Sequence, residues 1–122
     1  MALFKTKKNT PELNYLELIP FRMHESETEN GLTKILIPKF KREFFQNLIP
    51  KTKSKHFKVK LDELGSSVWE SIDGKKNVNK IIIELSEKYG EKIQPAEVRI
   101  TKFFTQLFQS NFINFKQLKK EN

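Results

Sequence analysis

The spacing of the hydrophobic residues changes at Leu61, and this change constrains the fold more than any other feature of the chain. Up to that point, Phe57, Val59 and Leu61 alternate with Lys58 and Lys60, which predicts a strand whose lysines face the opposite side. Beyond it, hydrophobic residues recur every three or four positions in three successive segments, as in amphipathic helices. We therefore expect an α+β fold, in which an N-terminal antiparallel three-stranded sheet is followed by a three-helix bundle.

Each of the three helices carries a start or stop signal. Asp62 is expected to cap the first, with Gly74 after Asp73 as its left-handed terminus; Asn77 opens the second, Gly90 ends it, and Pro95 opens the third. The expected apolar faces are Leu64, Val68, Trp69 and Ile72, then Val78, Ile81, Ile82, Leu85 and Tyr89, then Val98, Ile100, Phe103, Phe104, Leu107 and Phe108. The third stripe is wide enough for two neighbours, or for one neighbour and a groove. Phe112, Ile113 and Phe115 predict a short final strand.

The residues before position 57 predict a tail, a hairpin and a short helix. Residues 1–12 are polar and read as a flexible tail. A strand is expected over Asn14–Glu25, with Tyr15, Ile19, Phe21 and Met23 on its buried face and Pro20 at an edge position or a bulge. A long acidic turn, Ser26–Gly31, leads to a second strand, Leu32–Pro38. Lys39–Ile49 then fits a short amphipathic helix with Phe40, Phe44, Phe45, Leu48 and Ile49 on one stripe.

With 122 residues the chain suits one domain, expected over 13–122, with a hairpin and amphipathic extension in 13–56 and a core in 57–115. Its net charge of +8 is concentrated: residues 39–60 carry eight Lys or Arg against one Glu, a local +7. Such a patch favours an anionic partner, or is a solvated loop that keeps the protein in solution. The absence of Cys suits the cytoplasm, and no stretch is apolar enough for a signal peptide or a membrane span.

The sequence offers no catalytic constellation, so we expect a protein that is not an enzyme and uses no cofactor or metal. His24 and His56 have no metal-ligand spacing around them, and Ser66-Ser67 lacks the strand–turn–helix context of a nucleophile. Asp62, Asp73 and Glu97 sit at expected helix ends, where capping explains them.

The residues alone leave two functions open, nucleic-acid binding and oligomerisation. Three helices and a terminal strand are the components of a winged helix, so the basic 39–60 region could bind nucleic-acid phosphates. The third helix, however, presents Arg99, Lys102, Gln106 and Gln109 among apolar residues, and the second little beyond Lys80 and Lys88, a weak base-reading set. The stripe around Phe44 and Phe45 would instead support a homodimer.

The run from Leu61 to Lys75, followed by Val78, Ile81, Tyr89-Gly90, Phe104, Leu107 and Asn111-Phe112-Ile113, resembles the PqqD family. This resemblance covers about half of the chain. It implies a winged-helix-like domain that recognises the leader segment of a ribosomally made precursor peptide and presents the peptide to a modifying enzyme, often a radical S-adenosylmethionine (SAM) protein, as in coenzyme PQQ synthesis. The hairpin and extension over 13–49 are not predicted by the family's pattern.

The resemblance also implies where the peptide binds, in a groove between the third strand and the third helix. Carried over to this chain, the peptide-binding residues are Phe57, Lys58, Val59, Lys60 and Leu61 on the strand and Ile100, Phe104, Gln106 and Phe108 on the helix. An extended peptide would add to the strand, its acidic residues steered by Lys51, Lys53 and Lys55. Each of the helix Phe residues could equally be a core residue.

Overall fold

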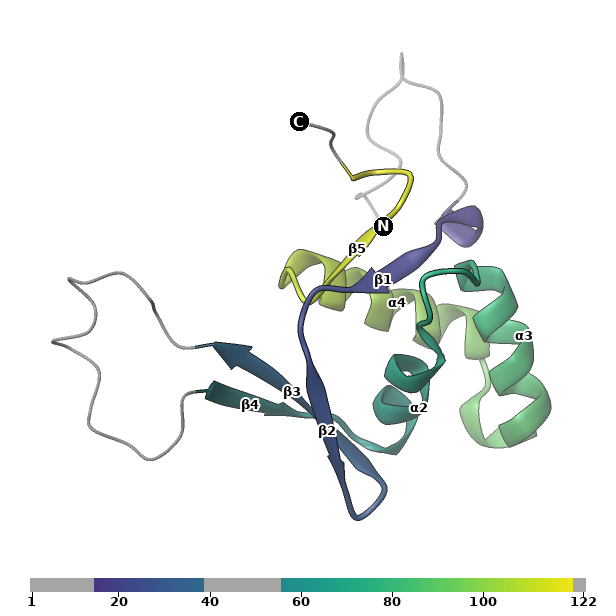
Figure 1. Ribbon diagram of the computed structural model, residues 1–122. Helices are drawn as coiled ribbons and strands as arrows, with labels where there is room; N and C mark the ends of the chain where they lie inside the picture. Colours follow the sequence, from purple (N-terminus) through teal and green to yellow (C-terminus); the bar gives the residue numbers. More distant parts are fainter. Residues whose placement is uncertain (1–14, 39–55, 120–122) are drawn as a thin grey trace, which may run out of the picture. The chain divides into compact units, whose positions relative to one another are not determined.

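A computed structural model describes residues 15–38 and 56–119, which form two compact units (Figure 1). One unit spans His24–Trp69, and the other combines the described residues up to Met23 with those from Glu70 onward. The expected tail over 1–12, the expected helix over Lys39–Ile49 and the steering residues Lys51, Lys53 and Lys55 lie outside the described residues. Within the described part of the chain, every helix is too short or too polar to cross a membrane.

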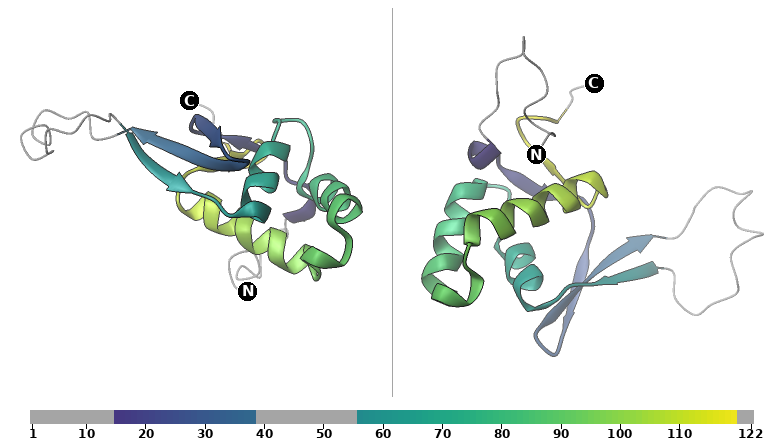
Figure 2. Two further views of the ribbon diagram at one scale, coloured as in Figure 1. Left: turned by 90° about the horizontal axis from the view of Figure 1, so that it is seen from below. Right: turned by 180° about the vertical axis from the view of Figure 1, so that it is seen from behind.

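The His24–Trp69 unit contains an antiparallel three-stranded sheet and most of a helix. The strands are β2 (Ser26–Glu29), β3 (Leu32–Pro38) and β4 (His56–Lys60), in the order β2-β3-β4, and α2 (Glu63–Ser71) follows them in the chain. In both views of Figure 2, β3 and β4 run side by side. The expected strands over Leu32–Pro38 and 57–61 are thus confirmed. Three α-helices among the described residues confirm the α+β class.

The turn between β2 and β3 is two residues long, so the long turn expected over Ser26–Gly31 is wrong. Glu29 pairs with Leu32, and only Asn30 and Gly31 lie between them. Both have positive φ angles, 56° and 79°, as a tight hairpin turn of the kind favoured by Asn-Gly requires. Residues 26–29 did not look like a strand because their inward positions carry Ser and Thr rather than apolar residues.

Hydrogen bonds join helix α2 to this sheet. Its Trp69, fully buried, donates its indole N–H to the Ser26 hydroxyl over 3.0 Å, which explains the polar residue on β2. The Ser66 hydroxyl accepts the backbone N–H of Thr33 at 2.8 Å and lies 3.4 Å from the carbonyl oxygen of Leu61, to which it donates. Ser66 therefore joins β3 to the residue after β4, where the two strands separate.

The second unit holds a two-stranded sheet and two long helices. Its elements are a 3₁₀ turn at Tyr15–Glu17, β1 (Pro20–Arg22), α3 (Val78–Tyr89), a 3₁₀ turn at Gly90–Ile93, α4 (Ala96–Gln109) and β5 (Ile113–Phe115). The first and last strands pair antiparallel, which confirms the final strand.

The single strand expected over Asn14–Glu25 is wrong, because the observed strand is shorter and buries the opposite set of side chains. Only Pro20–Arg22 form β1, and the buried residues are Leu18 and Pro20, whereas Met23 is 49% exposed. The reason is the pairing of Pro20 with Phe115, a fully buried residue 95 positions later, which sets the face of β1. Pro20 does lie on an edge strand, as expected, since β5 alone among the described strands pairs with β1.

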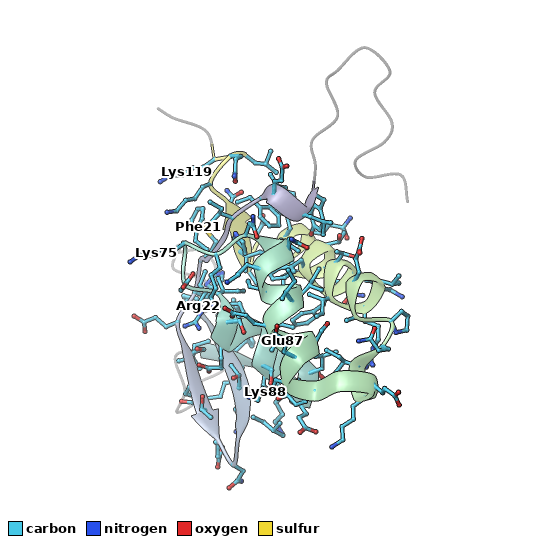
Figure 3. The ribbon with its side chains drawn as sticks, turned by 90° about the vertical axis from the view of Figure 1, so that its right-hand side faces the viewer. Phe21, Arg22, Lys75, Glu87, Lys88 and Lys119 are labelled. Carbon is cyan, nitrogen blue, oxygen red and sulfur yellow. The ribbon has the colours of Figure 1, made fainter. Side chains whose placement is uncertain are left out.

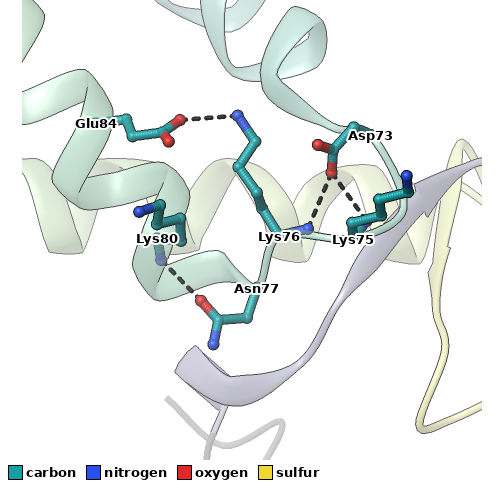
Figure 4. A network of polar contacts seen from close by, with 6 residues as sticks. All are labelled: Asp73, Lys75, Lys76, Asn77, Lys80 and Glu84. Carbon is teal, nitrogen blue, oxygen red and sulfur yellow. Dashed lines mark hydrogen bonds and ion pairs between the residues drawn. The ribbon is translucent and has the colours of Figure 1, made fainter.

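The side-chain caps at Asp62 and Asn77 form as the sequence predicts, whereas α2 ends at Ser71, three residues before the expected terminus Gly74. Asp62 accepts the Gly65 N–H at 2.7 Å, and Asn77 accepts the Lys80 N–H at 2.8 Å. Between α2 and α3, Asp73 accepts the N–H groups of Lys75 and Lys76, and Lys76 reaches Glu84 on α3 at 2.7 Å (Figure 4). The bonds to Lys76 and Lys75 lower the pKa of Asp73. The loop is therefore built to hold the start of α3.

An aromatic cluster forms the core beside α4. Phe115 on β5 contacts the rings of Tyr15, Phe104 and Phe108 at centroid distances of 5.5, 6.5 and 5.3 Å. Burial raises the pKa of Tyr15 to about 12, although a hydrogen bond from Thr105 acts in the opposite direction.

Val98 was expected on the apolar stripe of the third helix, but its side chain is 61% exposed and lies off that stripe.

Candidate functional site

Strand β4 is an edge strand, and it carries most of the strand residues that the sequence points to. It pairs with β3 on one side, and no other described strand pairs with it. An edge strand presents backbone N–H and C=O groups that can bond to an added chain. Only those residues of β4 whose N–H and C=O groups point away from β3 can bond an added chain.

The pairing register of β3 and β4 identifies these residues. The Leu61 N–H donates to the Thr33 carbonyl at 2.9 Å, so this pair is hydrogen-bonded. Hydrogen-bonded and non-bonded pairs alternate along an antiparallel ladder, so Val59 opposite Ile35 is also a bonded pair. Lys58 and Lys60 fall between these pairs, and their N–H and C=O groups point away from β3. We call these four groups the β4 edge.

The two faces of the sheet differ in chemistry beside this edge. One, the apolar face, carries Ile35, Phe57 and Val59; Ile35 is fully buried, Val59 half-buried and Phe57 53% exposed. The other, the basic face, carries Lys34, Lys58 and Lys60. Leu61, just beyond β4, is only 8% exposed and belongs to the core.

Acidic residues of β2 lie on the basic face and neutralise part of its charge. Lys34 forms an ion pair with Glu29, and Lys58 forms one with Glu27 at 3.2 Å. The hydrogen bond from Lys34 is the main reason why the pKa of Glu29 lies below its usual value, and the charges of Lys58 and Lys60 act in the same direction. Lys60 itself makes no ion pair with another described residue, and Lys34 stands directly opposite it in the register.

The four residues assigned to the helix do not share one surface of α4. Ile100 and Phe104 are fully buried, and Phe108 is half-buried against Phe115. Gln106 is exposed and lies roughly 160° around the helix from Phe108. A ligand cannot reach Ile100 or Phe104 where they stand, because these side chains fill the core.

Phe103 is the aromatic residue that shares a flank of α4 with Gln106. The two are three positions apart, hence neighbours on the helix surface, and Phe103 is half-buried. The apolar stripe alone could not identify it, because burial separates Phe103 from Phe104 only once the neighbours of α4 are known.

Cationic residues elsewhere in this unit contact aromatic rings. Lys119 lies 5.8 Å from the ring centroid of Phe21 (Figure 3). Lys88 lies 5.2 Å from the ring centroid of Tyr89. Arg99, one of the residues considered for reading bases, donates to the Lys92 carbonyl at 3.2 Å. These contacts are explained as local packing of long side chains.

The described residues contain no group of three His, Asp or Glu side chains placed to hold a metal ion. Ser66, adjacent to Ser67, is committed to the backbone of Thr33 and Leu61. Asp62 accepts a backbone N–H in the first turn of α2, and Asp73 accepts two in the loop between α2 and α3. That His24 and His56 take no part in metal binding stays a prediction.

Sequence reasoning missed the residues that give the basic face its pattern. The turn expected over Ser26–Gly31 includes Glu27 and Glu29, and the sequence pattern does not show that Lys34 pairs with β4. The signal was present in Asn30-Gly31, because a two-residue turn there places Glu27 opposite Lys34 and Glu29 opposite Leu32.

Comparison with known proteins gives one family and no individual relative. The family described as Coenzyme PQQ synthesis protein D (PqqD) matches residues 53–113, which include β4, the helices α2, α3 and α4, and the first residue of β5. Neither the curated proteins nor the solved structures contain a match to the chain. The matched segment is half of the chain and agrees with the resemblance of the sequence, and the chain belongs to the PqqD family.

Proposed function

We propose that this protein is a non-catalytic accessory protein that binds the leader segment of a ribosomally made precursor peptide and presents it to a radical SAM-type modifying enzyme. Coenzyme PQQ synthesis is the pathway that the family description suggests. The observation that carries the proposal is the β4 edge, where Lys58 and Lys60 turn their backbone groups away from β3.

Strand addition at this edge is physically reasonable. An extended peptide gains backbone hydrogen bonds along the strand, and its side chains alternate between the two faces of the sheet. Half-exposed Phe57 offers apolar surface on one face, and the lysines offer charge on the other. The lysines also disfavour pairing of β4 with β4 of a second copy, because like charges would meet across the ladder.

The test is an amide NMR titration of the full chain. The probes are the synthetic leader half of a short reading frame encoded beside the gene and, separately, a duplex DNA. We expect the peptide alone to shift the amides of residues 57–61, with affinity that falls only modestly as salt rises. Shifts caused by DNA on α3 and α4, together with silence toward the peptide, would overturn the proposal. Participation of α4 stays a prediction, read from the amide of Gln106.

A pair of variants at one position isolates the backbone contribution. Lys58→Pro removes an N–H that points away from β3, so the ladder keeps its bonds, while Lys58→Ala removes the charge and keeps the N–H. We expect Lys58→Pro to weaken peptide binding several-fold more than Lys58→Ala, with amide spectra that stay dispersed in both. Equal binding by the two variants would contradict strand addition. Presentation is tested by pull-down of a radical SAM enzyme encoded beside the gene, and we expect the enzyme to retain the peptide only when this protein is present.

A further inference from the structure

One lysine of the basic face, on the edge strand, forms no ion pair with another described residue. Lys34 is paired with Glu29 and Lys58 with Glu27, whereas Lys60 has no ion pair among the described residues. Lys60 stands opposite Lys34 in a non-hydrogen-bonded pair, the arrangement in which cross-strand side chains are closest. An acidic residue on the free side of β4 would therefore face Lys60 and reduce its repulsion with Lys34.

An added strand would meet this need in a defined pattern. The residues opposite Lys58 and Lys60 lie two positions apart on the added strand, and their side chains share the basic face. The residues opposite Phe57 and Val59 fall on the apolar face. This assignment follows from the pleat, so it is the same whether the added strand runs parallel or antiparallel.

We infer that the peptide held at β4 alternates acidic and apolar residues, with an acidic residue opposite Lys60 and apolar residues beside Val59 and Phe57. This inference rests on the proposed function and names the sequence class of the ligand. Lys60 is the main residue that selects the acidic side chain of the peptide, because Lys58 already forms an ion pair with Glu27. Exposed ion pairs are individually weak, so the lysine supplies selectivity while the backbone bonds supply most of the affinity.

The test compares two capped nine-residue peptides of identical composition, titrated into the full chain and followed by the amides of Lys58 and Lys60. In one, Glu alternates with Val; in the other, the Glu residues are grouped at one end. We expect the alternating peptide to bind about fivefold more tightly, as one to two exposed ion pairs allow. Equal affinities at β4 would overturn the inference and leave strand addition intact. Absence of any shift at β4 with either peptide would overturn both.

A charge exchange locates the contact. Lys60→Glu should weaken the alternating Glu peptide by about tenfold and accept a peptide in which Lys replaces Glu, whereas Lys60→Gln should cost about two- to fivefold. Lys58→Gln is the matched control, and its effect should be smaller than that of Lys60→Gln. Dispersed amide spectra establish that the variants fold. A larger loss from Lys58→Gln, or no rescue by the Lys peptide, would contradict the assignment to Lys60.

Discussion

Replacing Ser66 by Ala tests how the β3–β4 ladder is held at its end. The Ser66 hydroxyl accepts the Thr33 N–H at 2.8 Å, and Thr33 and Ser66 are 1% and 4% exposed. Without the hydroxyl, the Thr33 N–H is buried without its acceptor, which costs about 1–3 kcal/mol. Alanine is the better helix former by up to about 0.5 kcal/mol, so the free energy of unfolding should fall by about 1–2 kcal/mol.

Urea unfolding followed by circular dichroism measures this loss. At m-values ordinary for a chain of this size, the urea midpoint should fall by roughly 0.5–1.5 M. The matched control is Ser110→Ala, because Ser110 is exposed at the end of α4 and its change should stay within about 0.5 kcal/mol. Hydrogen exchange adds a local readout, since the Thr33 amide should lose protection beyond the global change. Equal midpoints for the two variants, with unchanged protection of Thr33, would refute the reasoning.

Three further predictions concern single features of the fold. Asn77→Ala should lower the free energy of unfolding by about 0.5–2 kcal/mol in urea titrations, because the Lys80 N–H loses its cap. Gly31→Ala should lower the free energy of unfolding by about 1–2 kcal/mol, since φ is +79° there. A synthetic β2–β3 hairpin peptide with the same change should lose cross-strand NMR contacts. Because the pKa of Tyr15 is raised to about 12 in the folded state, its contribution is complete below pH 10 and is lost as the pH rises from 10 through 12. Wild type should therefore lose more stability than Tyr15→Phe between pH 9 and pH 11.

The parts of the fold that sequence reasoning predicted are those governed by local physics. Helices α2 to α4 follow from periodic apolar residues and from the caps at Asp62 and Asn77, which need only nearby backbone. Strand β4 follows from strict alternation of apolar and charged residues. In each case the information lies within one or two turns of the chain, so no distant partner is needed.

The errors have the opposite origin. The face of β1 is set by Phe115, a residue almost the whole chain away, and the strand character of β2 depends on Trp69 and Lys34. The three residues of β1 are too few to show a period, and the four residues of β2 are all polar, so only the Asn30-Gly31 turn indicated its pairing. The same limit explains the helix residues of the candidate site: a wide apolar stripe does not say which of Phe103, Phe104 and Phe108 has a neighbour.

The chemistry of the β4 edge depends on the register of β4 more than on its composition. A shift of β4 by one residue would move Phe57 and Val59 to the basic face and turn Lys58 and Lys60 toward the apolar one. At the Leu61 end of the ladder, the Ser66 hydroxyl bonds both the Leu61 carbonyl and the Thr33 N–H, which favours the observed register. Loss of Ser66 should therefore weaken peptide selectivity as well as stability. The preference for the alternating peptide over the grouped one should shrink in Ser66→Ala while Ser110→Ala retains it, and an unchanged preference would show that the register is held elsewhere.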